Sequence, residues 1–439
     1  MTVDVPSPAL PHEPGALDLV VIGLGYVGLP LAQEAVRSGL RVAGYDRDPQ
    51  VVQALSAGRS HVDDIPGEAV AAMVARGFAP TDDPAVIARA STVVICVPTP
   101  LSEDGAPDLA AVRSATADVA RHLTPGTLVV LESTTYPGTT EEVLKPALED
   151  GGRLVGDDLF LAFSPERIDP GNPTYGFRNT PKVVGGVTPA CTERALAFYD
   201  RIVDTVVVAR GTREAEMTKL LENTYRHVNI ALVNEMARFC HELGIELWDV
   251  IRCASTKPFG FQPFYPGPGV GGHCIPIDPN YLSHEVRARL GYPFRFVELA
   301  QEVNAGMPAY VARRIQDALN DEGKPVRGST VLLLGITYKA DISDQRESPA
   351  RPLAQRLRQL GATVTYHDPH VARWRVDAED AEDDELTCVP DLTDAAAKAD
   401  IVVLLQRHTA YDLGAVVRAA HLVLDTRGAM PDAPTVEHL

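Results

Sequence analysis

Several features are missing from this sequence, and each absence excludes a class of protein. No apolar run approaches the roughly 18 residues of a transmembrane helix, and the opening MTVDVPSPALPHEPG lacks the regions of a secretory signal. The six cysteines form no C-x-x-C pair, which argues against a zinc site or a disulfide framework. A formal charge of −19 opposes binding to nucleic acid or anionic membranes. We therefore expect a cytoplasmic protein with no metal, no nucleic-acid partner and no membrane partner.

Short apolar runs alternate with alanine-rich helical stretches along most of the chain, a pattern typical of a mostly parallel sheet. About thirty residues from Thr212 to Leu243 contain no proline or glycine and carry apolar side chains at helical spacing, which predicts a long helix. The sequence therefore predicts an α/β protein with one sheet on either side of this helix. The apolar runs span 17–23, 41–45, 91–97, 127–131 and 159–163, and then 330–334, 363–366, 401–405 and 422–425.

A glycine fingerprint follows the first apolar run. Gly23 permits a tight bend, Gly25 lets the backbone approach a pyrophosphate, and Gly28 allows close packing of the following helix. Asp46 ends the next strand, where a carboxylate can accept hydrogen bonds from an adenosine ribose. The pattern predicts a dinucleotide site that favours NAD, although the adjacent Arg47 could accommodate a 2′-phosphate.

A second glycine-rich stretch, 266–279, contains Cys274. A free cysteine is most often a small buried hydrophobe. Here the flanking glycines and Asp278, four residues on, favour a nucleophilic thiol. A metal site that includes His273 is not expected, because adjacent side chains seldom converge on one ion.

Four further groups have a functional and a structural interpretation. Lys219 and Asn223 lie one turn apart on the predicted helix and form either a functional pair or a solvated stripe. Residues 133–138 are either a capped turn or a set of hydroxyls at the ligand-binding edge of the sheet, and 164–167 is either functional or a surface ion pair. Lys339 and Arg346 are candidates for the basic patch that an acidic protein needs to bind phosphates.

Taken together, the motifs resemble the UDP-glucose/GDP-mannose dehydrogenase family, in the family's order and over nearly all of residues 17 to about 430. The resemblance implies two Rossmann-like parallel-sheet domains joined by a long central helix, which also forms a homodimer interface. We expect a flexible tail (1–16), an NAD-binding domain (17–208), a central domain carrying the cysteine loop (209–310) and a UDP-sugar-binding domain (325–432). The motifs are GLGYVGLPLA, CVPTPL, STTYPGTT, SPERIDPGN, the 219–235 helix, GPGVGGHCIPIDP and GITYKADISDQRESP.

The resemblance also implies a reaction in which two NAD⁺ oxidise a sugar C6 alcohol to a carboxylate. Cys274 would form a thiohemiacetal and then a thioester, which water hydrolyses. Lys219 and Asn223 would stabilise or orient the C6 oxygen, and Asp278 would position water or accept a proton. Thr134 and Glu166 match the family's water-holding and acid/base positions.

The binding residues that the resemblance carries over fall into two sets. For NAD they are Gly23, Gly25, Tyr26, Val27, Gly28, Asp46, Arg47, Pro98, Thr99, Thr134 and Arg346. For the nucleotide sugar they are Glu166, Arg167, Ile168, Asp169, Lys219, Asn223, Phe264, Tyr265, Gly267, Gly269, Gly271 and Lys339.

The expected substrate is a UDP-N-acetylhexosamine, with UDP-N-acetylglucosamine preferred. Ile277 stands where glucose enzymes of the family usually have lysine, and Arg167 replaces their phenylalanine. UDP-glucose and the mannose and galactose epimers remain alternatives, because epimer choice rests on a few hydroxyl contacts. A single-step hydroxy-acid dehydrogenase and a non-catalytic nucleotide-sugar sensor are the competing interpretations.

Overall fold

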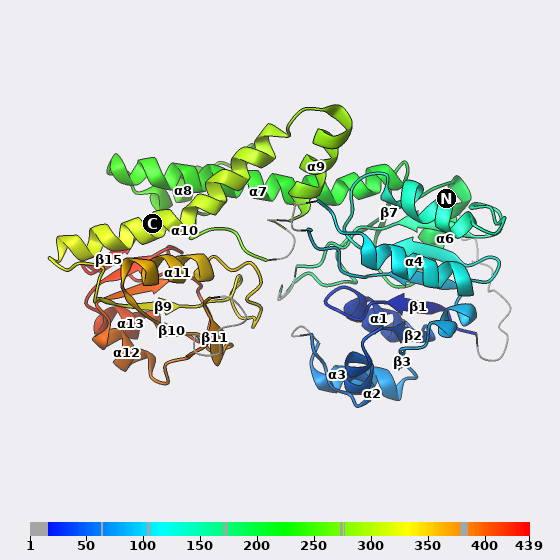
Figure 1. Cartoon of the computed structure of the whole chain (residues 1–439), viewed down its shortest axis with the longest axis horizontal. Coiled ribbons are helices and arrows are strands. Elements are labelled where there is room, and N and C mark those ends of the chain that lie inside the picture. Colours follow the sequence, from blue (N-terminus) through cyan, green and yellow to red (C-terminus); the bar gives the residue numbers. More distant parts are fainter. Residues whose placement is uncertain are drawn as a thin grey trace. The chain divides into compact units, whose positions relative to one another are not determined.

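The computed structural model describes residues 16–62, 65–102, 106–169, 172, 174–272, 275, 277–377 and 385–439, which form two compact units (Figure 1). The first unit comprises the described residues up to Glu222 together with Asn280–Arg289. The second comprises the described residues of 223–279 and 290–439. Of the predicted tail, only Ala16 lies within the described residues.

The first unit contains an eight-stranded sheet. Its strands are β1 (Leu19–Ile22), β2 (Val42–Tyr45), β3 (Ala79–Thr81), β4 (Thr92–Ile95), β5 (Leu128–Leu131), β6 (Phe160–Phe163), β7 (Lys182–Gly186) and β8 (Val206–Val208). Their order is β3-β2-β1-β4-β5-β6-β7-β8, and the first six pair in parallel, while β7 runs antiparallel to β6. The strand order therefore reverses between β1 and β4, which is where ligands bind in doubly wound folds.

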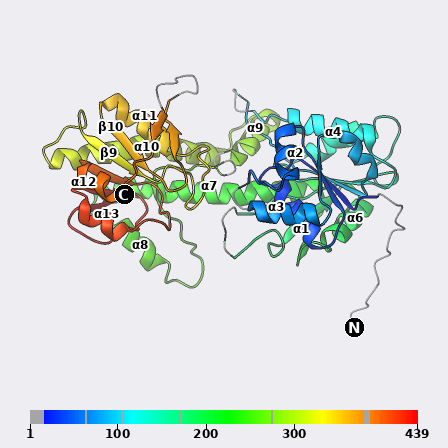
Figure 2. The same ribbon diagram turned by 90° about the horizontal axis from the view of Figure 1, so that it is seen from below.

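Helices cover both faces of this sheet, which is why its central strands are apolar on both sides (Figure 2). One core cluster joins Val21 and Val42 to α1, α2, α3 and α6, and another joins Val20 and Val129 to η1, α4 and α5. The helical elements are α1 (Gly28–Arg37), α2 (Pro49–Ser56), α3 (Gly67–Ala75), η1 (Pro84–Arg89), α4 (Ala110–His122), η2 (Thr140–Leu144), α5 (Lys145–Glu149) and α6 (Pro189–Tyr199).

The second unit contains a parallel sheet of five strands in the order β10-β9-β13-β14-β15, with α10 and α11 on one face and α12 and α13 on the other. A short antiparallel ribbon, β11 with β12, accompanies it. The strands are β9 (Thr330–Leu334), β10 (Thr363–His367), β11 (Arg373–Arg375), β12 (Glu385–Thr387), β13 (Ile401–Leu404), β14 (Val423–Asp425) and β15 (Val436–His438). The helices are α11 (Ala350–Leu360), α12 (Leu392–Lys398) and α13 (Leu413–Ala419).

The remaining helices are α7 (Thr212–Glu242), α8 (Leu247–Ala254), α9 (Asp278–Leu290) and α10 (Arg295–Asp321). Helix α7 runs from the first unit into the second and has the length that its lack of proline and glycine predicts. The predicted fold class, with two Rossmann-like parallel sheets and a long central helix, is confirmed. None of the described helices combines the length and the apolar character that a membrane span requires.

Candidate active site

The turn between β1 and α1 has the shape that its three glycines predict. Gly23 has φ +88°, and a Cβ there would lie 2.7 Å from the carbonyl oxygen of Cys96. A Cβ on Gly28 would lie 1.9 Å from the carbonyl oxygen of Gly23, so only glycine allows α1 to start this close to β1. At Gly25 a Cβ would meet nothing within 4 Å, which leaves open space beside the backbone. The turn therefore fits a bound pyrophosphate at the N-terminus of α1.

Asp46 braces this turn from the end of β2. Its Oδ2 accepts a hydrogen bond from the Leu24 amide at 2.9 Å, and its Oδ1 accepts one from the Asp48 amide at 3.0 Å. The carboxylate is half-buried, and the next residue, Arg47, is exposed. A carboxylate at this edge of the sheet has lone pairs left for ribose hydroxyls.

The ends of β4 and β5 are tied together beside this turn. The Thr99 hydroxyl donates to the Thr134 carbonyl at 2.8 Å, and the Ser133 hydroxyl donates to the Val97 carbonyl at 2.7 Å. The Tyr281 hydroxyl donates to the Thr99 carbonyl. The Ser133 hydroxyl therefore stabilises this turn, while both interpretations of the group 133–138 stay predictions. Pro98 belongs to the same loop, while Tyr26 and Val27 pack against the core cluster that contains α1.

The neighbouring Thr135 was not among the predicted site residues. Its side chain is buried, and its hydroxyl has no hydrogen-bond partner within the described part of the chain. A buried hydroxyl normally has a partner. The three consecutive hydroxyl residues after β5 pointed to this region of the chain. They did not indicate whether Thr134 or Thr135 would have the buried hydroxyl.

Lys219 and Glu166 meet in the first unit. Both are buried, and the Lys219 ammonium donates to the Glu166 backbone carbonyl at 2.6 Å. The Glu166 carboxylate accepts from the Ile168 amide through Oε1, while Oε2 has no hydrogen bond to the described residues. The backbone of Glu166 thus fixes the direction of the Lys219 charge, and its carboxylate keeps one acceptor atom for another group.

The next residue, Arg167, forms an ion pair with Glu222. Its Nη2 lies 2.7 Å from Glu222 Oε1, and its Nε lies 3.3 Å from Glu222 Oε2. Nη1 donates to the Pro181 carbonyl at 2.6 Å. Because three donors of the guanidinium are engaged, a substrate contact by Arg167 would use the donors that remain. Asp169 accepts a hydrogen bond from the Asn172 side chain at 3.1 Å.

In the second unit, Asn223 and Asp278 form a direct contact. The Asn223 amide nitrogen lies 2.5 Å from Asp278 Oδ2, and Asp278 is buried at the first residue of α9. This links the middle of α7 to the residue four places after Cys274. Cys274 and His273 lie outside the described residues, so their predicted roles stay predictions.

The loop before Cys274 is held by α7 and by the turn after β9. The Gly267 amide donates to Asn234 Oδ1 at 2.9 Å, and Gly269 has φ +139°. A Cβ on Gly271 would lie 2.7 Å from the Glu347 carbonyl oxygen. Tyr265 stacks on Trp248, with the ring centroids 5.8 Å apart, and Phe264 meets Tyr225 edge-on. The glycines therefore allow a close backbone approach within this unit.

The two predicted phosphate ligands of the second unit lie in that same turn. Arg346 forms a bidentate ion pair with Asp344, with Nε 3.0 Å from both carboxylate oxygens. Lys339 is half-buried, and its carbonyl accepts from the Thr337 hydroxyl at 2.8 Å. Arg346 is 46% exposed at its side chain, so the pairing with Asp344 leaves part of the guanidinium open to a ligand.

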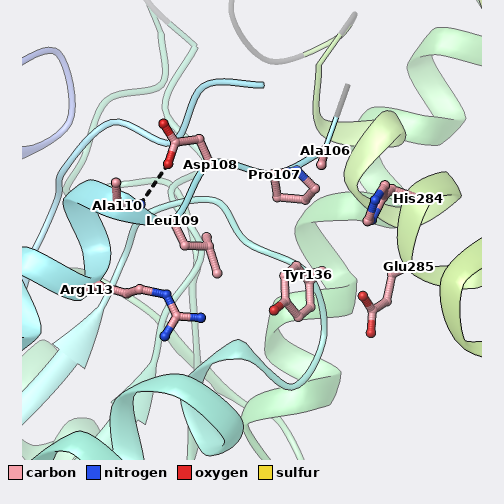
Figure 3. A pocket seen from close by; sticks show the side chains of 9 residues that line it. All are labelled: Ala106, Pro107, Asp108, Leu109, Ala110, Arg113, Tyr136, His284 and Glu285. Atoms are coloured by element: carbon pink, nitrogen blue, oxygen red, sulfur yellow. Dashed lines mark hydrogen bonds between the residues drawn. The ribbon is translucent and has the colours of Figure 1, made fainter. Parts of the chain in front are cut away.

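A cavity of about 390 Å³ opens in the first unit (Figure 3). Arg113 of α4, Tyr136 and the α9 side chains His284 and Glu285 line it together with 106–110. None of its lining residues was predicted as a site residue. Its walls mix both charge signs, which gives no preference for one ligand class.

A Rossmann sheet with a glycine turn, a ribose-type carboxylate and a buried lysine defines the chain as a nucleotide-dependent oxidoreductase. The chain belongs to the UDP-glucose/GDP-mannose dehydrogenase family. Residues 17–203 match the family's NAD binding domain, 213–306 its central domain and 332–432 its UDP binding domain. The protein is therefore an NAD-dependent nucleotide-sugar dehydrogenase, while the predicted domain boundaries stay predictions.

Similar proteins cover almost the whole chain. UDP-N-acetyl-D-mannosamine dehydrogenase of Salmonella typhi is 35% identical over 93% of this chain and 98% of its own length. UDP-N-acetyl-D-glucosamine 6-dehydrogenase of Pseudomonas aeruginosa is 33% identical over 94% and 96%. The solved structure of UDP-D-ManNAc dehydrogenase from Pyrococcus horikoshii has a TM-score of 0.86 and 30% identity, over 96% of this chain and 99% of that one.

Proposed function

We propose that this protein oxidises the C6 alcohol of a UDP-N-acetylhexosamine to the uronic acid in two successive two-electron steps. The observation that carries the proposal is the hydrogen bond between Asn223 and the buried Asp278, four residues after Cys274. An amide hydrogen-bonded to a carboxylate is suited to orient a carbonyl oxygen and a water in a reaction of a thiol. When bound, one NAD⁺ would accept a hydride in each step, so that two NAD⁺ molecules are reduced in turn.

In the proposed mechanism the Cys274 thiolate adds to the C6 aldehyde that the first oxidation leaves. The resulting thiohemiacetal is oxidised to a thioester, and water then displaces the thiolate to release the carboxylate. A thiol suits this route because it adds readily to the aldehyde and also leaves during hydrolysis. The thiol is thus regenerated, and four electrons leave the sugar.

The other residues act on charge and water. The Lys219 ammonium, directed by the Glu166 carbonyl, stabilises the negative charge that develops on the C6 oxygen. Asn223 holds Asp278 so that its carboxylate accepts a proton or positions the hydrolytic water. Glu166, which keeps one carboxylate oxygen open, and Thr134 hold water in the proposed reaction.

UDP-N-acetylglucosamine is the predicted substrate, and UDP-N-acetylmannosamine is its main rival. The motifs 164–167 and 271–279 support an acetamido sugar, and both named relatives act, by their names, on such a sugar. One relative is named for each epimer at similar identity. Because epimers differ by one hydroxyl position, overall similarity does not decide between them.

The test is to measure kcat/KM with UDP-GlcNAc, UDP-ManNAc, UDP-GalNAc and UDP-glucose, with product identification. We expect a uronic acid and a preference for an acetamido sugar over glucose of more than about tenfold. Wild-type-like rates in Cys274→Ser would contradict the thioester route and favour a single-step dehydrogenase. Tight binding of a sugar without NADH formation would favour a sensor.

We further propose that the protein is a homodimer that buries one face of α7. Tyr225, Leu232 and Phe239 recur at helical spacing on α7 and are 47%, 54% and 47% exposed. Large apolar side chains exposed in a row on one helix are typical of a contact surface. Sedimentation of the Leu232→Glu and Phe239→Glu variants tests this, with dissociation to monomers as the expected result.

A further inference from the structure

A buried ion pair in the first unit lies outside every predicted role. Lys182, at the start of β7, places its ammonium 2.9 Å from Glu132 Oε2, at the end of β5. The two side chains are 5% and 0% exposed. Taking two charges out of water costs several kcal/mol per ion. A buried ion pair that carries this cost is a candidate for a functional role.

Hydrogen bonds connect the pair to the proposed catalytic lysine. The Tyr199 hydroxyl donates to Glu132, and Lys182 is followed directly by Val183 on β7. Ser164 begins the segment 164–166, and its own hydroxyl donates to the Val183 carbonyl at 2.8 Å. That segment ends in the Glu166 carbonyl.

The last link is the hydrogen bond from Lys219, whose ammonium donates to the Glu166 carbonyl at 2.6 Å. The connection therefore runs from the Lys182–Glu132 pair along β7 to the Val183 carbonyl, and from there through Ser164 to the group that directs Lys219. A displacement of the carbonyl would move that charge.

We propose that Glu132, Lys182 and Tyr199 are positioning residues for Lys219, and that Lys182 has to balance the Glu132 charge for the 164–166 segment to keep its place. This inference deepens the proposed function and rests on it for its kinetic consequences. Without Lys182, an ionised Glu132 would be an uncompensated buried charge, and its protonation would be the only way to neutralise it.

The groups that face Glu132 come from every element around it. They are Lys182 on β7, Tyr199 on α6, Glu166 after β6 and Cys96 after β4. Burial raises the pKa of Glu132, and it raises the pKa values of Tyr199 and Cys96 well above their ordinary values of 10.0 and 9.0. A new ionisation of a carboxyl group in a Lys182 variant would therefore belong to Glu132.

The test compares Lys182→Met, Lys182→Arg and the double variant Glu132→Gln/Lys182→Met. In Lys182→Met we expect kcat to fall roughly ten- to a hundredfold as the pH rises from 6 to 9, with KM for the UDP-sugar changed less than about threefold. Lys182→Arg keeps the charge and should follow the wild-type profile. The double variant should lose the new ionisation, because no titrating group remains at position 132.

Tyr199→Phe and Arg178→Met complete the set. Tyr199→Phe should lower kcat at all pH values without a new ionisation, because it removes a hydrogen bond to Glu132 but leaves the ion pair with Lys182. Arg178→Met, which removes exposed ion pairs to Glu34 and Asp204, should change neither parameter. The proposal would be overturned if Lys182→Met lost the same fraction of kcat at every pH. It would also be overturned if the double variant kept the pH dependence of Lys182→Met. Either result would leave these residues only a structural role.

Thermal unfolding gives a second readout that needs no activity. With Lys182 removed, the pKa of Glu132 rises further in the folded state, so Lys182→Met should lose Tm as the pH increases from about 5 to 9. The double variant should show no such loss and should be more stable than Lys182→Met at pH 9. A wild-type protein that forms no NADH from any UDP-sugar would contradict the proposed function, while this Tm comparison would still decide whether Lys182 balances Glu132.

Discussion

The first turns of the two sheets begin alike. In each, a glycine with positive φ follows the first strand: Gly23 at +88° and Gly335 at +76°. In each, an aspartate after the neighbouring strand accepts a hydrogen bond from the amide that follows this glycine. Asp46 does so at 2.9 Å and Asp368 at 2.8 Å. The aspartate thus has the same structural task in both units.

The two turns differ in the groups that they leave available to a ligand. Helix α1 begins at Gly28, directly after its turn, whereas α11 begins only at Ala350. Asp46 is half-buried, but Asp368 is buried and lies 3.1 Å from His408 Nε2. The first turn therefore offers a helix N-terminus and a free carboxylate to a dinucleotide. In the second turn His408 occupies the carboxylate, and a ligand would have to be bound by side chains.

The side chains around Asp368 also include a cluster that has the composition of a metal site. Ligand atoms of Asp341, His370 and His408 lie within 4.8 Å of one another. His408 is already engaged at both nitrogens, since Nδ1 accepts from the Asp341 amide at 2.9 Å and Nε2 faces Asp368. A bound metal would displace the Nδ1 hydrogen bond, so the cluster is better explained as bracing the turn.

The largest expected effect follows from blocking the first turn. Gly25→Val places its side chain where a Cβ meets nothing within 4 Å, so the fold should keep its Tm. The side chain would fill the space proposed for the pyrophosphate, and we expect NAD to bind on the order of a hundredfold more weakly, about 2.7 kcal/mol. Gly176→Val, also in open space, is the matched control. Unchanged NAD affinity in Gly25→Val by calorimetry would place the dinucleotide elsewhere.

The two aspartates should respond in opposite ways to the same substitution. Asp46→Ala removes the ribose acceptor, and we expect about tenfold weaker NAD binding, or 1.4 kcal/mol. Asp368→Ala leaves His408 without its partner and should reduce the free energy of unfolding by about 3 kcal/mol with no change in NAD affinity. Chemical denaturation and NAD titration of both variants check this. Weaker NAD binding in Asp368→Ala would remove the distinction between the two turns.

One buried group in each unit should also change the free energy of unfolding with pH, in opposite directions. In the first unit, burial raises the pKa of Glu216 from 4.5 to about 7, although its carboxylate accepts from the Gly138 and Thr140 amides. Its contribution to stability is complete below pH 4.5 and is lost as the pH rises through 7. Across that range the free energy of unfolding should fall by roughly 3 kcal/mol. Glu216→Gln should remove this slope, as measured by denaturation between pH 4.5 and 8.

For His227, in the second unit, we expect the opposite dependence of stability on pH. Burial lowers its pKa from 6.5 to about 4, so its contribution is present above pH 6.5 and is lost as the pH falls through 4. The difference again corresponds to roughly 3 kcal/mol. His227→Gln should flatten the acid side of the stability curve. If both variants flatten the same side, burial does not control these two groups.

The smallest expected effect concerns the sugar. Arg167 is already paired with Glu222, so Arg167→Phe should lower the preference for UDP-GlcNAc over UDP-glucose only a few-fold, within about 1 kcal/mol. Competition assays that measure the ratio of kcat/KM check this. An unchanged ratio would mean that Arg167 serves the ion pair alone.

The parallel sheets, α7 and the glycine turn were predictable because each depends on local pattern: apolar runs, missing helix breakers and glycine spacing. The tertiary partners of charged residues were not. Nothing in the sequence indicated that Arg167 pairs with Glu222, or that Glu132 and Lys182, 50 positions apart, would meet in the core. The only sign of this pair in the sequence was one charged residue beside each of two apolar strands, and many such residues are exposed to solvent.

The most direct test of the central proposal is the amount of NADH formed per UDP-sugar consumed when the sugar is limiting. The thioester route predicts a ratio of about two, because each C6 alcohol gives up four electrons before release. A ratio near one, with an aldehyde or ketone as the product, would contradict it and would leave Cys274 without the proposed role.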